Sequence, residues 1–468
     1  MTHQDALADI VGQKFAVSGA DAANWQKEWT GDYAVDPLVV VRPATTEEVS
    51  KIAAYANAND LTLVPVSGNT GLTGATSNQG AVMLSVDRLN KIEQIDTEGR
   101  TITVGAGTIL QSIHEAVDPH DLIFPLTFGA KGTAMIGGAL STNAGGSNVL
   151  RYGNTRDLCL GLEVVLADGR VMNLMSALHK DNSGYNLKHL MIGAEGTLGI
   201  ITRAVLRLYS KPKAYATAMV ATPTVSDALS LLYRMQDATG GAVEAFELMT
   251  RGYIDLHLRQ VEGAKEPFDA AYDTNIMIEV GATSDEDAAV LDTGQTRIIE
   301  KLENILGSML EEEAVLDAVI AQNEAQRREM WARREAAGHI GYAEGPRVDT
   351  DIAVPLDKVG FAIEEIERRY KELDPEAWDI VVAHLGDGNI HHAIYSDNVS
   401  QEFSDKCVET VEDVVQEIGG SFSAEHGVGL SKLKTMSRRK DPVALAAMRS
   451  IKDALDPKGT LNPGKVIP

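Results

Sequence analysis

LTLVPVSGNTGLTG, residues 61–74, is a short apolar strand that runs directly into a loop of glycines and small polar residues. Upstream, a capped start at Thr45 predicts a helix that continues to Ala58. Further short strands are predicted at residues 81–86 and 101–104, so this part of the chain is mixed α and β. A glycine-rich loop after a strand is typical of phosphate binding, because several backbone N–H groups can converge on one anion.

A second concentration of glycine lies in residues 129–199, which contain 13 of the 42 glycines of the chain. Backbone this rich in glycine can lie close to a ligand. The loop at 67–74 lacks the lysine of a Walker phosphate loop, and Leu110 stands where a Rossmann fingerprint needs its third glycine. We therefore predict that the loops at 67–74 and 129–146 bind an extended ligand such as a dinucleotide. The alternative is that both are tight turns without a ligand.

A pair of strands nearer the C-terminus carries three histidines. VVAHL at 381–385 and IHHAIY at 390–395 have the composition of strands, and GDGN between them is a loop of turn formers. In that register His384 lies directly opposite His391 on one face of the hairpin, and His392 points to the other face.

A carboxylate and an imidazole, Glu425 and His426, stand side by side further along the chain in SAEHGVG. Two imidazoles and one carboxylate that leave a coordination position open are the ligand set of a catalytic Zn²⁺ site or a similar divalent site. We predict that His384, His391 and Glu425 hold such a metal. The alternative is a group of hydrogen-bonded histidines around a turn.

The composition narrows the classes of function. A chain of 468 residues is expected to form two domains, and a region rich in Glu and Ala begins near residue 213. Long helical patterns are predicted in that region at 284–311 and 315–337. The net charge of -25 argues against general electrostatic binding to nucleic acid or to an anionic membrane.

The cysteines and the N-terminus bear on the location of the protein. Cys159 and Cys407 are the only cysteines, so no disulfide framework is expected, and a cytoplasmic location is predicted. The N-terminus lacks the basic start and apolar core of a signal peptide, and no apolar run is long enough to cross a bilayer. A soluble protein without an integral membrane segment is expected.

Several motifs together resemble one family of flavoproteins. PVSGNTG at 65–71 is similar to the pyrophosphate loop of the FAD-binding fold that vanillyl-alcohol oxidase and p-cresol methylhydroxylase share. Other segments resemble further flavin-binding stretches of that fold: GTAMIGG at 132–138, STNAGG at 141–146, DNSGYNL at 181–187 and GAEGTLGI at 193–200. HLGDGNIH at 384–391, EHG at 425–427 and the tail DPKGTLNPGK at 456–465 resemble one branch, the FAD-linked D-2-hydroxyacid dehydrogenases. That branch includes D-lactate and D-2-hydroxyglutarate dehydrogenases and the flavin subunit of glycolate oxidase.

The resemblance implies an α+β protein in three parts. Residues 1–213 would form the two-subdomain FAD-binding domain, and residues 214–424 would form an α+β substrate (cap) domain that carries the metal hairpin. Residues 425–468 would return and pack on the flavin site. The FAD would be bound noncovalently, because the loops at 67–74 and 132–148 contain no histidine.

The resemblance also implies which residues bind FAD. They lie in the glycine-rich segments and in the C-terminal tail. They are Pro65, Ser67, Gly68, Asn69, Thr70, Gly71, Thr133, Gly137, Gly138, Ser141, Asn143, Gly145, Gly146, Glu195, Gly196, Gly199, Ile200 and Asn462.

In such an enzyme a divalent metal, Zn²⁺ first and Mn²⁺ second, would acidify the hydroxyl of the bound 2-hydroxy acid. His426 would take the hydroxyl proton while a hydride leaves Cα for flavin N5. The resemblance points to Arg334 as the residue that binds the substrate carboxylate. Its neighbour Arg333 diverges by about 100° on a helix and is expected on the surface.

Three positions depart from the pattern expected of D-2-hydroxyglutarate dehydrogenases. Gly338 and Asp349 stand where a Thr and a Lys are expected, and Ala393 stands where an Asn is expected. Arg347 could replace the missing lysine, or it could be a solvated loop residue. The side chain of the 2-hydroxy acid is therefore left open, with D-lactate and D-2-hydroxyglutarate as the two cases.

Two other classes of function remain at this point. A metal-dependent hydrolase would use the histidines but not the glycine loops, and a non-catalytic flavin-binding electron-transfer subunit would use the loops but not Glu425 and His426. The expected partners of an oxidising enzyme are its substrate and an electron acceptor, which could be an electron-transfer flavoprotein, a quinone or a cytochrome. A homodimer is also expected.

Overall fold

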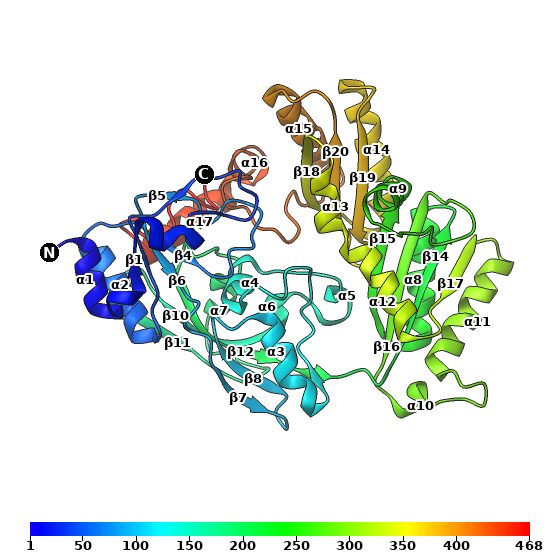
Figure 1. Ribbon diagram of the computed structural model, residues 1–468, viewed down its shortest axis with the longest axis horizontal. Coiled ribbons are helices and arrows are strands. Elements are labelled where there is room, and N and C mark those ends of the chain that lie inside the picture. The colour runs from blue at the N-terminus through cyan, green and yellow to red at the C-terminus, as the bar shows by residue number, and fades with distance from the viewer. The chain divides into compact units, whose positions relative to one another are not determined.

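The computed structural model describes residues 1–468, apart from the side chains of residues 342 and 343. The chain forms two compact units (Figure 1). The first unit comprises residues 1–145, 153–210 and 425–468, and the second unit comprises residues 146–152 and 211–424. The breaks after residues 210 and 424 lie near the predicted boundaries, whereas the grouping of segment 146–152 with the second unit was not predicted.

A small sheet in the order β1-β3-β6-β4 begins the first unit. β3 (Val39–Val41), β6 (Val82–Ser85) and β4 (Leu63–Val66) run parallel, and β1 (Ala16–Val17) is antiparallel to β3. Helix α1 (His3–Val11) packs beside this sheet, and α2 (Thr46–Ala58) packs on α1. The predicted helix start is confirmed, because the Thr45 hydroxyl accepts a hydrogen bond from the Glu48 N–H at 3.2 Å.

A five-stranded antiparallel sheet in the order β11-β10-β12-β8-β7 forms the second layer of the first unit. The strands predicted at 81–86 and 101–104 are confirmed as β6 and β8. The other elements of this region are β7 (Ile92–Asp96), β8 (Thr101–Gly105), β10 (Cys159–Val165), β11 (Val171–Leu174), β12 (Ile200–Arg207), α3 (Leu110–Val117), α4 (Ile136–Thr142), α6 (Thr155–Leu158) and α7 (Leu187–Met191). Two short strand pairs complete it: β2 (Val35–Asp36) with β5 (Asn78–Gln79), and β9 (Leu122–Ile123) with β13 (Tyr209–Ser210).

The C-terminal segment returns to the small sheet of the first unit. After α16 (Leu433–Arg439) and α17 (Pro442–Leu455), Leu461 pairs in parallel with Leu63 of β4. The Leu63 N–H donates to the Thr460 carbonyl at 2.8 Å, and the Asn462 N–H donates to the Leu63 carbonyl at 2.9 Å. The tail therefore lies beside the strand that leads into the first glycine loop.

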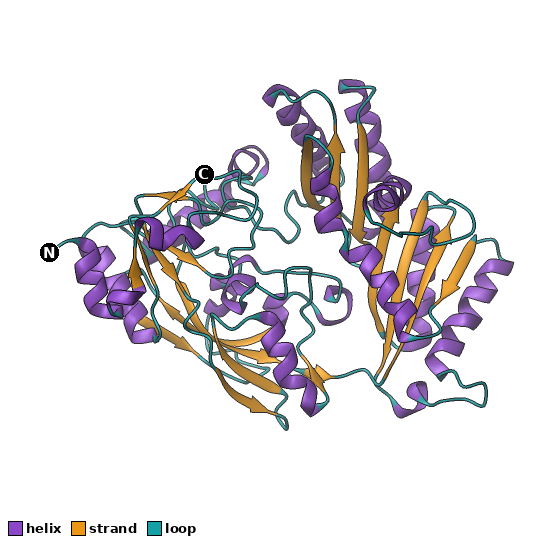
Figure 2. Ribbon diagram, viewed as in Figure 1, coloured by secondary structure: helices purple, strands orange, loops and turns teal.

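The second unit is built on a seven-stranded sheet in the order β17-β14-β16-β15-β19-β20-β18, whose neighbours are all antiparallel (Figure 2). Its strands are β14 (Ala214–Thr222), β15 (Val243–Thr250), β16 (Thr274–Ala282), β17 (Asp317–Ile320), β18 (Arg347–Ala353), β19 (Trp378–His384) and β20 (Asn389–Tyr395). The short helix α5 (Val149–Tyr152) also belongs to this unit.

Helices cover both faces of this sheet, because alternate side chains of each strand are apolar on both sides. One face packs on α8 (Val225–Thr239), α11 (Arg297–Glu311), α14 (Val359–Leu373) and α15 (Gln401–Glu417). The other packs on α9 (Arg251–Gln260), α12 (Glu324–Glu335) and α13 (Ala337–Ala343). The remaining short helices of the chain are α10 (Asp285–Ala288), η1 (Gln13–Phe15), η2 (Gly19–Trp25), η3 (Asp118–His120) and η4 (Leu356–Lys358).

Both long helical patterns predicted for the second unit are wrong in part. The pattern at 284–311 is interrupted between α10 and α11, where Gly294 at φ +86° closes a turn with Leu291. The pattern at 315–337 begins with the strand β17, which pairs with residues 218–221 of β14. An available sheet edge outweighs a local helical pattern, because tertiary pairing routinely overrides propensity.

Helix length and apolarity also bear on membrane insertion. Among the residues that the structure describes, none of the helices combines the length and the apolar character needed to span a bilayer.

Candidate functional site

The first glycine loop, residues 67–74, lies against the second glycine segment in the first unit. A Cβ on Gly68 would stand 2.4 Å from the Thr133 carbonyl oxygen, so the two backbones touch where only glycine fits. The Gly138 N–H donates to the Ser67 hydroxyl at 3.1 Å. The structure therefore brings these predicted cofactor-binding residues together although they are far apart in the sequence.

The backbone of this loop offers hydrogen-bond donors. Within the described part of the chain, the N–H groups of residues 68–73 have no protein acceptor. The Asn69 side chain, in contrast, is used within the protein, since it donates to the Lys27 carbonyl at 2.6 Å and accepts from Thr76 at 2.8 Å. A run of unpaired N–H groups on a loop after a strand fits a diphosphate.

Two other predicted cofactor residues hold the C-terminal segment to this unit. The buried Glu195 carboxylate accepts the N–H groups of Val428 and Gly429 at 2.7 and 2.9 Å. Burial raises the pKa of the Glu195 carboxyl although these hydrogen bonds oppose the shift. The Asn462 amide donates to the carbonyls of Glu195 and Ala75 at 2.8 and 3.1 Å. These contacts give both side chains a structural role.

The remaining predicted cofactor residues lie in the same glycine-rich segments, including α4 and the start of β12. Ser141 uses its hydroxyl within α4, where it donates to the Gly137 carbonyl at 2.7 Å. A Cβ on Gly196 would meet the Pro65 ring at 3.0 Å, so Gly196 packs on the strand that ends in the first loop. Gly146 alone lies in the segment that groups with the second unit. The others are Thr70, Gly71, Asn143, Gly145, Gly199 and Ile200, all in the first unit.

The histidine hairpin forms, but the predicted register is wrong by two residues. His384 faces Asn389, and His391 faces Val382. The turn includes Gly388, at φ +82°, where a Cβ would stand 2.2 Å from the Val354 carbonyl oxygen, so the ladder starts at Asn389. A shift by an even number keeps both histidines on one face, and their rings lie 5.4 Å apart edge to face.

The opposite direction of His392 is confirmed. Its Nε2 lies 2.6 Å from the Asp379 carboxylate on the other face of the hairpin. The His392 side chain is fully buried there, next to the ring of Tyr370. His392 is therefore separate from the predicted metal ligands.

The structure brings the three predicted ligands together. One ligand atom each from His384, His391 and Glu425 lies within 4.8 Å of the others. Glu425 directly follows Ala424, whose N–H donates to the Asp351 carbonyl at 3.2 Å, so the chain is anchored beside β18 immediately before it. This spacing of two imidazoles and a carboxylate fits a divalent metal with an open coordination position.

His426 lies in a second, overlapping group with Asp351 and His391, again within 4.8 Å. Its Nε2 is 3.9 Å from the Glu425 carboxylate, and its side chain is partly exposed. Asp351 was not predicted. The sequence did contain a signal for it, because Asp351 lies two positions after Asp349 in β18 and so points to the same face. The predicted base is thus next to the predicted metal ligands.

A buried carboxylate that was not predicted stands behind His384. Glu247 of β15 pairs directly with His384 in the sheet and has no exposed surface. His384 Nδ1 hydrogen-bonds to Glu247 Oε1 at 2.9 Å, and a carboxylate on one ring nitrogen is the usual partner of a histidine that binds a metal through the other. Burial alone would raise the pKa of Glu247, but the charges of His384 and Arg334 outweigh burial and lower it. The sequence signal was an acidic residue in an otherwise buried strand.

Arg334 lies on the other side of Glu247. Its Nε is 2.8 Å from Glu247 Oε2, and its side chain is nearly buried. Neither Nε nor Nη2 is aligned on a hydrogen-bond acceptor within the described part of the chain. A buried guanidinium with N–H groups to spare suits a carboxylate ligand.

Arg333 is not on the surface, so that prediction is wrong. It is buried, with only 6% of its surface exposed, and its side chain contacts the loop that follows α9. Its Nη2 donates to the Lys265 carbonyl at 3.2 Å, and its own carbonyl accepts the Tyr253 hydroxyl at 2.5 Å. The Arg333 side chain thus binds the loop after α9, and its backbone carbonyl binds α9 itself.

Arg347 is a strand residue of β18 and not a solvated loop residue. Its Nε lies 2.7 Å from the Asp349 carboxylate, and only 9% of its side chain is exposed. Asp349 pairs with Ala393, and this pair lies next to the pair of Asp351 and His391 on the same face of the sheet. Gly338 lies in α13, where a Cβ would meet no atom within 4 Å.

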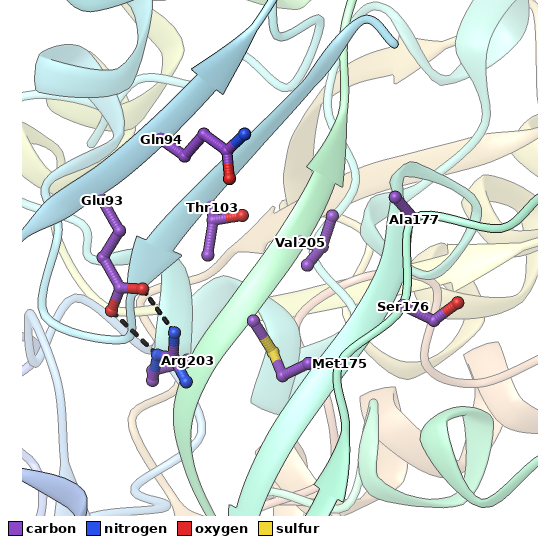
Figure 3. A pocket seen from close by; sticks show the side chains of 8 residues that line it. All are labelled: Glu93, Gln94, Thr103, Met175, Ser176, Ala177, Arg203 and Val205. Atoms are coloured by element: carbon purple, nitrogen blue, oxygen red, sulfur yellow. Dashed lines mark hydrogen bonds and ion pairs between the residues drawn. The ribbon is translucent and has the colours of Figure 1, made fainter.

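A separate surface hollow lies on the five-stranded sheet of the first unit (Figure 3). On one side Arg203 forms an ion pair with Glu93 through Nε and Nη2, and its Nη1 donates to Glu163 at 3.4 Å. The hollow contains none of the predicted site residues. Its lining residues are Glu93, Gln94, Thr103, Met175, Ser176, Ala177, Arg203 and Val205.

Comparison with known proteins identifies relatives along the whole chain. Residues 37–175 match the FAD binding domain, and residues 211–466 match the C-terminal domain of the FAD linked oxidases. A probable mitochondrial D-2-hydroxyglutarate dehydrogenase of Oryza sativa subsp. indica is 36% identical over 98% of this chain and 80% of its own length. The D-2-hydroxyglutarate dehydrogenase of Xanthomonas citri pv. viticola is 33% identical over 96% of this chain and 93% of its own.

A solved structure confirms the predicted fold. p-Cresol methylhydroxylase with substrate bound superposes with a TM-score of 0.73 at 15% identity, covering 99% of this chain and 96% of that one. At this identity the likeness concerns the fold alone. The predicted α+β architecture of the vanillyl-alcohol oxidase and p-cresol methylhydroxylase type is therefore correct.

The glycine contact at residue 68 gives a test of the first loop. Gly68→Ala is expected to lose most of its FAD, because its Cβ would overlap the Thr133 carbonyl and push the two loops apart. Gly307→Ala in α11 is the control, since a Cβ there meets no atom within 4 Å and the position lies outside both glycine loops. FAD per chain is measured by absorbance after gel filtration. Equal FAD content in the two variants would show that the contact does not shape the flavin site.

Proposed function

This chain belongs to the FAD-linked oxidases, and on that basis we propose that it oxidises a D-2-hydroxy acid to the 2-oxo acid with the help of a divalent metal. The relatives support an FAD-dependent oxidoreductase activity. Because they carry the name D-2-hydroxyglutarate dehydrogenase, D-2-hydroxyglutarate is the first substrate to test. The observation that carries the proposal is the cluster of His384, His391 and Glu425, in which His384 shares the buried Glu247 with Arg334.

When bound, the metal ion would acidify the substrate hydroxyl and FAD would accept the hydride from Cα. His384, His391 and Glu425 are the residues that would hold the metal, and the loop at 68–73 would bind the FAD diphosphate. Arg334 would bind the substrate carboxylate through its unaligned N–H groups and so orient the Cα–H bond.

His426 is the proposed general base. It follows the ligand Glu425 in the chain, is partly exposed, and has a ring nitrogen within 4.8 Å of a ligand atom of His391. A neutral imidazole there would take the proton of a hydroxyl held by the metal. The proton could then pass to solvent, because the ring is not closed off from it.

Two kinds of substrate differ in the side chain on Cα: D-lactate carries a methyl group, and D-2-hydroxyglutarate carries a second carboxylate. Asp349 and Ala393 offer no positive charge one row beyond His391. Arg347 is a further cation on this face, and its guanidinium is held by Asp349. A dicarboxylate would have to displace Asp349 from Arg347, whereas D-lactate would leave that pair intact.

Reduction of the flavin by substrate tests the whole proposal. The purified protein is expected to be yellow and to bleach under anaerobic conditions with D-2-hydroxyglutarate or D-lactate, with the L-enantiomers as controls. A strong chelator should abolish bleaching while FAD stays bound, because metal and flavin are proposed to be held by separate residues. Zn²⁺ or Mn²⁺ should restore it. Normal bleaching by protein shown to be metal-free by elemental analysis would contradict the metal role.

Replacement of His426 tests the proton step. His426→Asn is expected to keep metal and FAD but to slow flavin reduction about 10²-fold or more, the scale of a lost general base. The rate is measured by stopped-flow under single-turnover conditions. A variant that reduces its flavin as fast as the parent would remove His426 from the chemistry.

A pair of arginine variants tests the carboxylate site. Arg334→Ala is expected to lower kcat/KM about 10- to 150-fold, since a hydrogen bond to a charged group contributes roughly 1.5 to 3 kcal/mol. Arg333→Ala is the control, because its contacts are to the Lys265 and Tyr253 region. It is expected to lower the melting temperature with a smaller effect on kcat/KM. Equal effects of the two variants on kcat/KM would place the substrate carboxylate elsewhere.

A further inference from the structure

Two buried carboxylates fasten helix α12 to the sheet of the second unit. Glu279 of β16 binds Arg327, and Glu247 of β15 binds Arg334. The two arginines are seven residues apart, about two helical turns, so both point toward the sheet. Each pair thus joins a buried carboxylate of the sheet to an arginine of α12. The two carboxylates differ in their other hydrogen-bond partners.

The Glu279 pair is saturated within the protein. Arg327 donates to both oxygens, through Nε at 2.6 Å and Nη2 at 2.7 Å. Trp331 Nε1 donates to Oε2 at 2.8 Å, and the Thr217 hydroxyl donates to the same oxygen at 2.7 Å. Packing of α12 accounts for this arrangement, because both carboxylate oxygens have donors from the protein.

The Glu247 pair is different in two ways. Its second partner is an imidazole, His384, at 2.9 Å, and not a group of α12. Its arginine is close, but Nε and Nη2 of Arg334 are not aligned on an acceptor within the described part of the chain. Glu247 thus joins a proposed metal ligand to a proposed substrate-binding residue through a single buried carboxylate.

We infer that Glu247 is a positioning residue of the active site, which fixes His384 with Nε2 presented to the metal and holds Arg334 ready for the substrate carboxylate. The inference rests on the proposed function and extends it to a residue that would touch neither metal nor substrate. A carboxylate on the far nitrogen fixes the tautomer and orientation of a ligating histidine, and it increases the basicity of the ligand. All three side chains belong to the second unit.

The experiment measures metal affinity, which a purely structural role would not change. Glu247→Gln and the matched control Glu279→Gln are prepared as FAD-bound full-length proteins. Dissociation constants for Zn²⁺ and Mn²⁺ are obtained by competition with a chromophoric chelator, together with melting temperatures. Glu247→Gln is expected to bind metal about 10- to 100-fold more weakly, the usual effect of removing such a partner. Glu279→Gln is expected to lower the melting temperature and to leave metal affinity unchanged.

The outcomes separate this inference from the proposed function. If the parent protein binds no metal, the proposed metal site itself is wrong. If the parent binds metal and Glu247→Gln binds it equally tightly, only the inference is overturned. Equal losses of affinity in Glu247→Gln and Glu279→Gln would also overturn it, because the effect would then follow from loosening α12.

A second variant covers a failure of Glu247→Gln to fold. Glu247→Asp keeps the buried charge but is one methylene shorter, so it cannot reach His384 and Arg334 together. It is expected to lose metal affinity several-fold and to recover substrate oxidation when Zn²⁺ or Mn²⁺ is raised to saturation. Unchanged metal affinity in this variant would overturn the inference as well.

Discussion

The buried charge of Glu247 is the constraint on which the candidate site depends. A carboxylate without exposed surface costs several kcal/mol unless it is paired, on the order of the penalty for a buried ion. Its partners come from β19 and α12, as His384 and Arg334. Three elements that are far apart in the sequence must therefore meet at one point, and the same requirement brings an imidazole and a guanidinium into one site.

In the first unit, close contacts at glycine residues hold the loops in place. Gly68 touches the Thr133 backbone, and a Cβ on Gly427 would stand 2.7 Å from the Glu195 carboxylate, which accepts the next two N–H groups of the chain. Side chains at these glycines would separate the layers. The loops thus keep the N–H groups of residues 68–73 without a protein acceptor, which is the property a diphosphate requires.

The errors of prediction have a common cause in tertiary contact. The hairpin register differs by two residues because Gly388 fits tightly against the carbonyl of Val354, the residue that follows β18. Arg333 is buried against the loop that follows α9, where its side chain donates to the Lys265 carbonyl. The region at 317–320 is a strand because β14 offers it an edge. None of these partners is close in sequence, so no local pattern could reveal them.

The sequence by itself determined the family, the two glycine loops and the identity of the metal-binding candidates, because these depend on residue types in short motifs. It also placed His384 and His391 on one face, since strand periodicity survives a register shift by an even number. Only the tertiary structure decided that Glu247 stands behind His384, that Arg334 reaches the same carboxylate, and that Glu195 holds the C-terminal tail. The reason is physical: a buried charge takes its partners from whatever elements pack around it, and that packing is settled by the whole fold.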